Sequence, residues 1–401
     1  MILRKNSQEV KEIISRALNL EKYIPKVREI IENVRRCGDK ALIEYTKIFD
    51  KVEIDSVELK FSIIKKLSSQ VSSEFKMNVG KVIDSIFTFY EGFEFKNIET
   101  MFRDVKRIAK WIPISKVGIY VPKNYISTAL MTIIPAKVAK VKNVSIATPP
   151  LSNGLISPEM AYILDYLNID IVYRVGGAQA IAALAYGTET VQRVDKIVGP
   201  GNVYVQTAKL LVSTQVGIDG FEGPTEIVIY IDDPDKIESA VLDLLAQLEH
   251  GVSSIGVVIS ISEELLRKFL EKLSNTYSND LGKYYLIHVN NTDEAIELIN
   301  DLAPEHLVVY SGDAWRIVNK IENAGVVSIN TPSPFLDYAA GISHVLPTSG
   351  TARWRGIITP LDFMKPIGIV ENFDKELIKA SIMLAEIERF KYHRESLRSI
   401  I

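Results

Sequence analysis

The chain has 401 residues, of which 47% are hydrophobic and 24% are charged, a composition typical of a globular protein with two or three domains. A formal net charge of −3 argues against a nucleic-acid-binding protein, which would carry a basic excess. Because Cys37 is the single cysteine, no intramolecular disulfide can form, and any zinc site must use nitrogen and oxygen ligands. The first residues lack a secretion-signal core, and no apolar run is long enough to span a bilayer. We therefore expect a cytoplasmic protein without membrane contact.

The first part of the chain is predicted to be mainly helical. Apolar residues recur at helical spacing over 8–19 and again over 27–34. A short strand-like pattern at 52–61 precedes a long predicted helix over about 71–93, and further strand-like stretches lead to Val121. We interpret these segments as packing elements.

From Tyr120 onward, predicted strands and helices alternate, which is the pattern of a mostly parallel α/β sheet. The first block contains a helix at 128–138, a strand at 144–147, a helix at 158–167, a strand at 169–175, a helix after Gly176-Gly177, a strand at 196–198 and a helix at 203–212. The second block contains strands at 226–231, 255–261, 284–289, 306–310 and 326–329, with helices at 237–249, 263–273, 293–302 and 314–321 between them.

We therefore predict an α/β fold with two incomplete Rossmann-like domains, each built on a mostly parallel sheet, plus small helical segments at the N- and C-termini. The two blocks cover about 120–224 and 225–330. Ligands of such folds bind at the carboxyl ends of the strands, so we expect the functional site at those ends, in a cleft between the sheets.

One motif carries polar residues inside an apolar predicted helix. It reads L-L-A-Q-L-E-H-G from Leu244 to Gly251. Gln247 and His250 are three residues apart and share a helix face, where an amide oxygen and an imidazole could hold a metal or a polar substrate. The alternative is an ordinary helix end, with His250 at the negative end of the dipole and Gly251 as the stop. Taken alone, the motif favours the ordinary helix end.

Two glycine turns lie where phosphates could approach backbone amides at a helix start. They are Gly176-Gly177, followed by Gln179, and Gly199-Pro200-Gly201, followed by Asn202. Neither turn is a G-x-G-x-x-G sequence, and glycine after a strand can equally form a simple tight turn. These turns alone are weak evidence for a nucleotide.

Three further groups of residues could carry chemistry. Glu305 and His306 are adjacent at a predicted strand start and could handle two different protons. Asp337 lies in a loop and could be a hard oxygen ligand or a turn-capping residue. Glu388 and His393 are five residues apart, so they do not share a face of one regular helix. Each group alone is also compatible with a solvated surface.

Together these motifs, in this order, resemble the histidinol dehydrogenase family over roughly residues 20–400. The matching runs are G-I-Y-V-P from Gly118, V-G-G-A-Q-A-I-A-A-L-A-Y-G-T-E from Val175, D-K-I-V-G-P-G-N from Asp195, G-P-T-E-I-V from Gly223, L-L-A-Q-L-E-H-G from Leu244, A-P-E-H-L from Ala303, D-Y-A-A-G-I-S-H-V-L-P-T from Asp337, and the final Glu388/His393 pair.

The resemblance implies oxidation of L-histidinol to L-histidine through the aldehyde, in two hydride transfers to NAD. His306 would accept the hydroxyl proton and Glu305 would activate water. The implied ligands of one zinc ion per subunit are Gln247, His250, Asp337 and His393. The implied substrate contacts are Thr225, Gln247, His250, His306, Asp337, Glu388 and His393. The implied NAD contacts are Tyr120, Gln179 and Asn202.

The resemblance also implies a homodimer in which the C-terminal segment reaches the partner's site. The corresponding boundaries are 1–20 for an N-terminal helical segment, 21–119 with 225–358 for a substrate and zinc domain, 120–224 for an NAD domain, and 359–401 for an exchanged C-terminal helical segment. The chain departs from the family at Lys123-Asn124, where two glycines are usual, and this affects the expected NAD loop. The alternatives are a zinc- and NAD-dependent relative with another amino alcohol or aldehyde as substrate, and a non-enzymatic binding paralogue.

Overall fold

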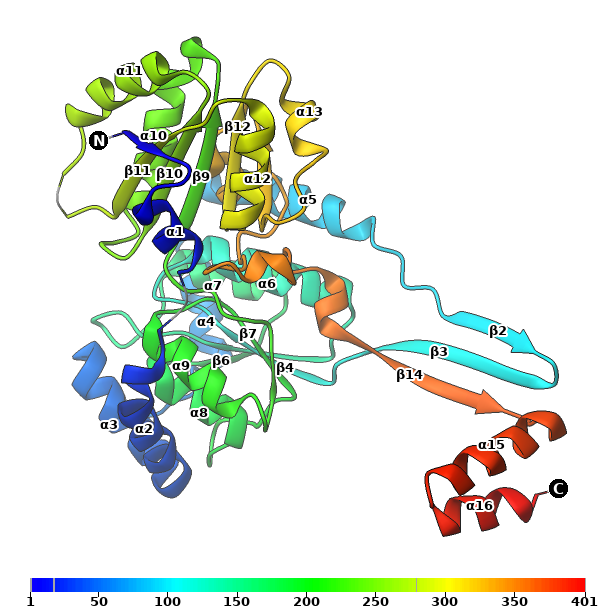
Figure 1. Cartoon of the computed structure of the whole chain (residues 1–401). Helices are drawn as coiled ribbons and strands as arrows, with labels where there is room; N and C mark the ends of the chain where they lie inside the picture. The colour runs from blue at the N-terminus through cyan, green and yellow to red at the C-terminus, as the bar shows by residue number, and fades with distance from the viewer. Residues whose placement is uncertain (1, 17–18, 279, 401) are drawn as a thin grey trace. The chain divides into compact units, whose positions relative to one another are not determined.

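A computed structural model describes residues 2–16, 19–278 and 280–400 of the chain (Figure 1). Its contacts divide the chain into two compact units, the first formed by 1–92 and 114–363 and the second by 93–113 and 364–401. No helix among the described residues is long and apolar enough to cross a membrane.

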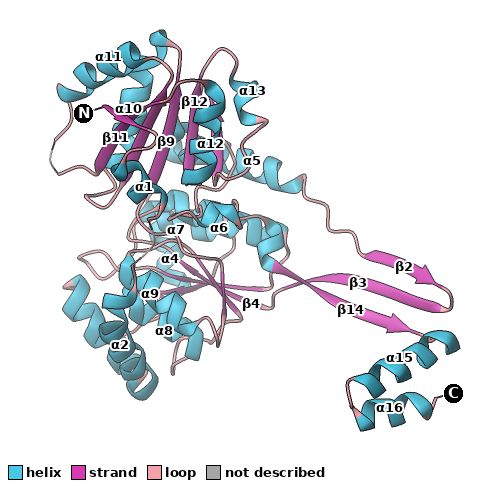
Figure 2. Ribbon diagram, viewed as in Figure 1, coloured by secondary structure: helices cyan, strands magenta, loops and turns pink. Residues whose placement is uncertain are grey.

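The first unit contains a six-stranded sheet that is parallel throughout (Figure 2). In spatial order its strands are β1 (Ile2–Arg4), β11 (Lys283–His288), β10 (Ile255–Ser260), β9 (Glu226–Ile231), β12 (His306–Tyr310) and β13 (Val326–Ile329). The central strands β9 and β12 are buried along their whole length, as their continuous apolar sequence requires.

Alternate side chains of this sheet pack against helices on opposite faces. Ile227, Ile229 and Ile231 belong to one apolar cluster with α10 (Ile237–Leu248) and α11 (Glu263–Ser274). Val228 and Tyr230 point the other way and belong to a second apolar cluster. The helices of that second cluster are α1 (Gln8–Ile14), α12 (Thr292–Leu302) and α13 (Ala314–Val318).

A second parallel sheet, of five strands, lies in the same unit. Its spatial order is β6 (Ile171–Tyr173), β5 (Asn143–Ala147), β4 (Lys116–Tyr120), β7 (Lys196–Val198) and β8 (Gly217–Ile218). The helices that follow its strands or pack beside them are α2 (Ile24–Cys37), α3 (Asp39–Tyr45), α4 (Phe61–Ser68), α5 (Ser73–Glu91), α6 (Ile126–Val138), α7 (Pro158–Tyr166), α8 (Gly177–Tyr186) and α9 (Val203–Val212).

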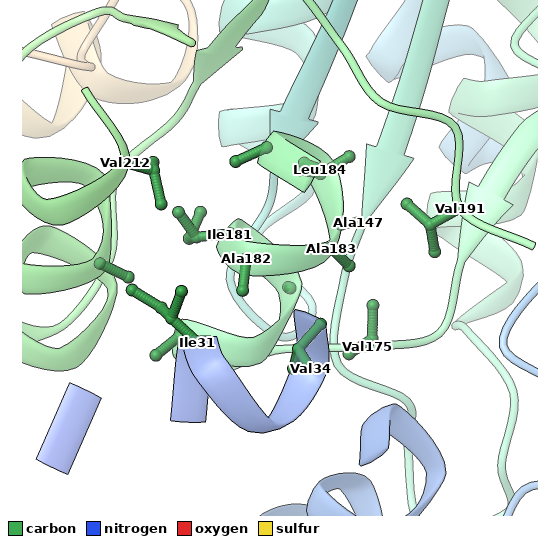
Figure 3. Packing of buried hydrophobic residues seen from close by; sticks show 14 of the residues in the cluster. Ile31, Val34, Ala147, Val175, Ile181, Ala182, Ala183, Leu184, Val191 and Val212 are labelled. Atoms are coloured by element: carbon green, nitrogen blue, oxygen red, sulfur yellow. The ribbon is translucent and has the colours of Figure 1, made fainter. Parts of the chain in front are cut away.

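Helix α8 forms the centre of the core around this sheet (Figure 3). Every residue from 178 to 185 is buried. Alanine at five of these positions lets α2 and α9 pack closely on the helix, while Ile181 and Leu184 fill the space between them. The alanine-rich sequence therefore explains why α8 is buried on all sides.

The second unit is a three-stranded antiparallel sheet and a helical pair. Its sheet order is β14 (Met364–Glu371), β3 (Val105–Pro113) and β2 (Ile98–Phe102), and its helices are α15 (Lys375–Ile387) and α16 (Lys391–Arg398). The short elements of the first unit are η1 (Glu21–Tyr23), the π-helical turn η2 (Thr46–Asp50), η3 (Pro234–Lys236), α14 (Ser333–Tyr338), η4 (Thr351–Arg353) and η5 (Pro360–Phe363).

The predicted α/β class with mostly parallel sheets is confirmed, but three local predictions differ from the structure. The strand expected at 52–61 is absent from this described segment, where only Glu58 makes an isolated bridge, to Tyr173. Strand β1 was not predicted, since its three residues form a strand only by pairing with β11. The C-terminal segment 359–401 is not wholly helical, because β14 pairs with β3. The predicted domain boundaries stay a prediction.

A buried carboxylate joins three elements of the first unit. In α10, Asp243 Oδ1 accepts hydrogen bonds from the backbone N–H of Ser333 at 2.9 Å and from its hydroxyl at 2.5 Å. Asp243 Oδ2 accepts from the hydroxyl of Tyr310, at the end of β12, at 3.1 Å. Burial raises the pKa of Asp243 to about 6, although these donors oppose the shift.

This raised pKa predicts a pH-dependent contribution to stability. The stabilisation is fully present below the unfolded-state pKa of Asp243 and is lost as pH rises through about 6, because folding then requires a buried charge. In Asp243→Asn this titration is absent. The free energy of unfolding of the unaltered chain minus that of the variant should therefore fall by roughly 2–3 kcal/mol between about pH 4 and pH 7, as measured by urea unfolding. A difference that stays constant with pH would contradict the account.

Candidate active site

The candidate residues lie at the amino end of one parallel sheet and at the carboxyl end of the other. In the six-stranded sheet, Thr225 immediately precedes β9, and Glu305-His306 stands at the start of β12. In the five-stranded sheet, Tyr120 ends β4 and Asn202 follows β7. The expectation of carboxyl ends is therefore wrong for the six-stranded sheet. Helix α10 runs back from the carboxyl end of β9, so its last residues reach the amino end.

Glu305 and His306 form a buried acid–base pair. Their side chains are 10% and 4% exposed, and Glu305 Oε1 lies 4.0 Å from His306 Nε2. The other Glu305 oxygen accepts a hydrogen bond from the backbone N–H of Glu226 at 2.8 Å. Burial raises the pKa of Glu305 well above its ordinary value and lowers the pKa of His306. At neutral pH the imidazole is neutral and can accept a proton.

Gln247 is held by two hydrogen bonds in a fixed orientation. Its Nε2 donates to Ser333 Oγ and to Asp337 Oδ2, both at 2.9 Å. Ser333 in turn donates to Asp243, so the chain of bonds runs from the middle of α10 to its last turn through α14. Since both amide hydrogens are used, the amide oxygen of Gln247 is the atom available to a ligand.

Asp337 faces the acid–base pair. Its Oδ1 is buried without a hydrogen-bond partner among the described residues and lies 3.6 Å from His306 Nε2. Its backbone carbonyl accepts a hydrogen bond from His344 Nδ1 at 2.6 Å, and His344 Nε2 lies 3.3 Å from the hydroxyl of Thr128. His250 follows the end of α10, is exposed, and contributes to the lowered pKa of His306.

The family model for histidinol dehydrogenase matches residues 14–400. The chain belongs to the histidinol dehydrogenase family. It is 46% identical to a histidinol dehydrogenase of Saccharolobus solfataricus over 94% of this chain and 96% of the relative, and 42% identical to that of Sulfolobus acidocaldarius over 96% and 97%.

The crystal structure of histidinol dehydrogenase from Elizabethkingia anophelis is similar to the whole fold. It matches with a TM-score of 0.90 and 30% identity, over 99% of this chain and 96% of that one. The predictions that the chain is an enzyme and an NAD-dependent oxidoreductase of this family are thereby confirmed.

The donor set in the first unit is compatible with a zinc ion, as the histidinol dehydrogenase family implies. No group of three or more His, Cys, Asp or Glu side chains within the described ranges is placed to hold a metal by itself. The first unit contributes an amide, an imidazole and a carboxylate from Gln247, His250 and Asp337, and the partnerless Oδ1 of Asp337 fits a cation. Glu388, the C-cap of α15, and His393, in α16, belong to the second unit.

The residues predicted to contact NAD lie around the two glycine turns. The hydroxyl of Tyr120 accepts a hydrogen bond from the backbone N–H of Gly177 at 3.2 Å, and burial raises the pKa of Tyr120 to about 12. Gln179 is buried, and its Oε1 has no partner in the described part of the chain. Asn202 caps α9 by accepting from the backbone N–H groups of Tyr204 and Val205.

The departure at Lys123-Asn124 keeps the backbone shape that glycine would permit. Asn124 has a φ of +63°, in the left-handed region that asparagine tolerates better than other non-glycine residues. Lys123 is exposed, and its charge acts against the burial that raises the pKa of Asp50. The loop is therefore formed without either glycine.

Sequence reasoning missed the residues that orient the site. Ser333 and Asp243 fix the amide of Gln247, and Thr128 bonds to His344. The position of Ser333 between two prolines, at the start of a short helix, was the available signal. For Asp243, the available signal was its position as a charged residue inside an apolar predicted helix.

Gly199 gives a test of the turn geometry. Its φ is +126°, and a Cβ added there would lie 2.0 Å from the backbone oxygen of Tyr120. Gly199→Ala should lower the free energy of unfolding by at least about 2 kcal/mol, because both strain and overlap must be relieved. The matched control is Gly312→Ala, where a Cβ meets no atom within 4 Å, and we expect a change within about 0.5 kcal/mol. Equal losses in urea unfolding would show that this contact does not constrain the turn.

Proposed function

We propose that the chain oxidises L-histidinol to L-histidine through L-histidinaldehyde, in two NAD-dependent hydride transfers that end histidine biosynthesis in the cytoplasm. The observation that carries this proposal is the buried Glu305-His306 pair, with opposite pKa shifts, beside the partnerless oxygen of Asp337. Formation of two NADH per L-histidinol consumed tests it directly. Absence of turnover in zinc-loaded protein would overturn it.

His306 acts as the base in each oxidation. Its neutral imidazole accepts the hydroxyl proton of the substrate at Nε2, the atom that faces Asp337 and Glu305. The carbon that carries this hydroxyl group loses a hydride to NAD. The electron pair of the broken C–H bond passes to the nicotinamide, and the C–O bond gains double-bond character. Burial of the imidazole keeps its pKa low, so the base is free at neutral pH.

Glu305 serves the step between the two oxidations. It removes a proton from the water that adds to the aldehyde, while the protonated His306 returns its proton to the carbonyl oxygen. His306 is then neutral again and can accept the hydroxyl proton of the hydrate in the second oxidation. The raised pKa of Glu305 makes it a better base than an exposed carboxylate. Because both groups lie at one strand start, the reactive aldehyde need not leave the site between steps.

We assign Gln247, His250, Asp337 and His393 as the residues that would hold one zinc ion per subunit. When bound, zinc supplies a template that orients the imidazole and amino groups of the substrate. These four residues, His306, Thr225 and Glu388 then contact L-histidinol. The hydrogen bonds from Gln247 to Ser333 and Asp337 support this assignment, because they turn the amide oxygen toward a ligand.

We assign NAD to the carboxyl end of the five-stranded sheet. Tyr120 ends β4, Gln179 lies in the first turn of α8, and Asn202 caps α9, so all three stand at helix starts or strand ends that suit phosphates. The partnerless, buried Oε1 of Gln179 supports a hydrogen bond to a bound ligand.

We further propose a homodimer in which residues 359–401 complete the partner's site. Large apolar side chains of α15 and the segment after it are exposed within the chain, which is unfavourable unless another surface covers them. They are Met383, Leu384, Ile387, Phe390 and Tyr392. Exchange of this segment would bring Glu388 and His393 to Gln247, His250 and Asp337 of the other subunit.

Substitution of the acid–base pair should separate the two oxidations. His306→Asn should lower kcat by roughly 10²–10⁴-fold, because the proton acceptor of both steps is lost. Glu305→Gln should retain the first oxidation but slow hydration, so that NADH formed per histidinol consumed falls from two toward one. Rapid-quench product analysis with NADH absorbance measures both values.

His288→Asn is the control for these variants, since His288 lies in β11 outside the proposed site. It should leave kcat unchanged. Two NADH per histidinol in Glu305→Gln, at the unaltered rate, would remove Glu305 from the hydration step.

Mixed dimers test the exchanged segment. His306→Asn and His393→Asn should each be inactive as homodimers, and His393→Asn should also lose zinc. In randomly mixed dimers, an exchanged tail would leave one intact site in each heterodimer, so activity should return to about a quarter of the unaltered value. If each tail served its own subunit, the heterodimer would contain no intact site, and the absence of recovery would contradict the exchange. Co-expression with two affinity tags followed by activity and metal assays gives the measurement.

A further inference from the structure

An ionic cluster is buried beside the turn Gly199–Asn202. It consists of Lys209, Asp219, Glu222 and Arg355, whose side chains are between 0% and 10% exposed. Lys209 Nζ lies 2.5 Å from Asp219 Oδ1 and 2.6 Å from Glu222 Oε2, and Arg355 Nη1 lies 2.8 Å from Glu222 Oε1. Two positive and two negative groups therefore balance inside the first unit.

Two members of this cluster, Asp219 and Lys209, bond to the backbone of Gly199 on both sides. The N–H of Gly199 donates to Asp219 Oδ2 at 2.6 Å, and its carbonyl accepts from Lys209 Nζ at 3.0 Å. The next contact along the turn is made by Gln206, whose Nε2 donates to the carbonyl of Gly201 at 3.1 Å. Side chains of Lys209, Asp219 and Gln206 thus fix the backbone of the turn before α9. The first N–H groups of the helix itself donate to the side chain of Asn202.

The cluster is hard to explain as a source of stability alone. Removing four charges from water costs several kcal/mol for each ion, and well-packed apolar residues of the same size often stabilise a protein as much or more. Burial accordingly raises the pKa of Glu222 despite its two cationic partners. What apolar residues cannot do is bond to the N–H and carbonyl of one glycine at a φ of +126°.

We propose that Lys209 and Asp219 are positioning residues for the cofactor. Their hydrogen bonds to the N–H and the carbonyl of Gly199 hold Asn202 and the first amides of α9 in the orientation that receives NAD. This inference rests on the proposed function, because that function assigns NAD to this turn. Glu222 and Arg355 form a second ion pair, which is joined to the first through Lys209 and Glu222.

Two double variants separate the hydrogen bond from Lys209 to Gly199 from the other ion pairs of the cluster. Lys209→Met with Glu222→Gln removes the bond to the Gly199 carbonyl and leaves Asp219 balanced by Arg355. Arg355→Met with Glu222→Gln leaves Lys209 and Asp219 in place. Each variant removes one cation and one anion, so both remain electrically balanced. The Lys209 variant loses all three ion pairs of the cluster, whereas the Arg355 variant loses two and keeps the Lys209–Asp219 pair.

Steady-state kinetics and hydrogen exchange on the full-length protein should distinguish the variants. We expect the KM for NAD to rise at least about tenfold in the Lys209 variant and to stay within about twofold in the Arg355 variant, with the KM for L-histidinol unchanged in both. Amide exchange at residues 199–203, measured by mass spectrometry, should accelerate in the Lys209 variant only.

The outcomes separate this inference from the proposed function. If unaltered protein forms no NADH from L-histidinol, the proposed function fails, and the exchange rates still decide whether Lys209 fixes the turn. Equal KM changes in the two variants, or unchanged exchange at 199–203 in a folded Lys209 variant, would overturn the inference.

Discussion

The burial of Glu305 and His306 at the first position of a central strand is the constraint on which the rest of the site depends. In water, a carboxyl and an imidazole side by side would both be charged near pH 6, and neither would make a good base. Enclosure at the start of β12 raises the pKa of Glu305 and lowers the pKa of His306, so the neutral form of each group is favoured, and the backbone N–H of Glu226 keeps one Glu305 oxygen in place. Strands β9 and β12 are buried on both faces, so the sheet contributes to this enclosure.

Part of this organisation could be predicted from the sequence. The alternation of strands and helices after Tyr120 gave the two parallel sheets, because apolar periodicity is a local property. The pairing partner of a strand is not local, which is why β1 and β14 were missed: each exists through a strand more than two hundred residues away. The same limit applies to Asp337, whose neighbours Gln247 and His306 come from other elements.

The side chains that support the site were the hardest to predict. Gln247 and His250 stood out because they interrupt an apolar helix, but Ser333 and Asp243 fix Gln247 through contacts that span about ninety residues. Serine and aspartate occur widely at turns and caps, so their residue types carry no specific signal. Only the fold shows that one aspartate bonds at once to α14 and to β12.

The candidate residues lie at the amino end of the six-stranded sheet and at the carboxyl end of the five-stranded sheet. Helix ends of opposite partial charge therefore meet the two groups of residues. Helix α10 reaches the site with its C-terminus, the negative end of its dipole, and Gln247 and His250 lie there. Helices α8 and α9 present the positive ends of their dipoles at the glycine turns. A cationic amino alcohol and a metal ion suit the first side, and a dinucleotide pyrophosphate suits the second. The amino-end placement of Glu305 and His306, which the usual rule for α/β folds did not predict, therefore puts them at the same end of the six-stranded sheet as the C-terminus of α10.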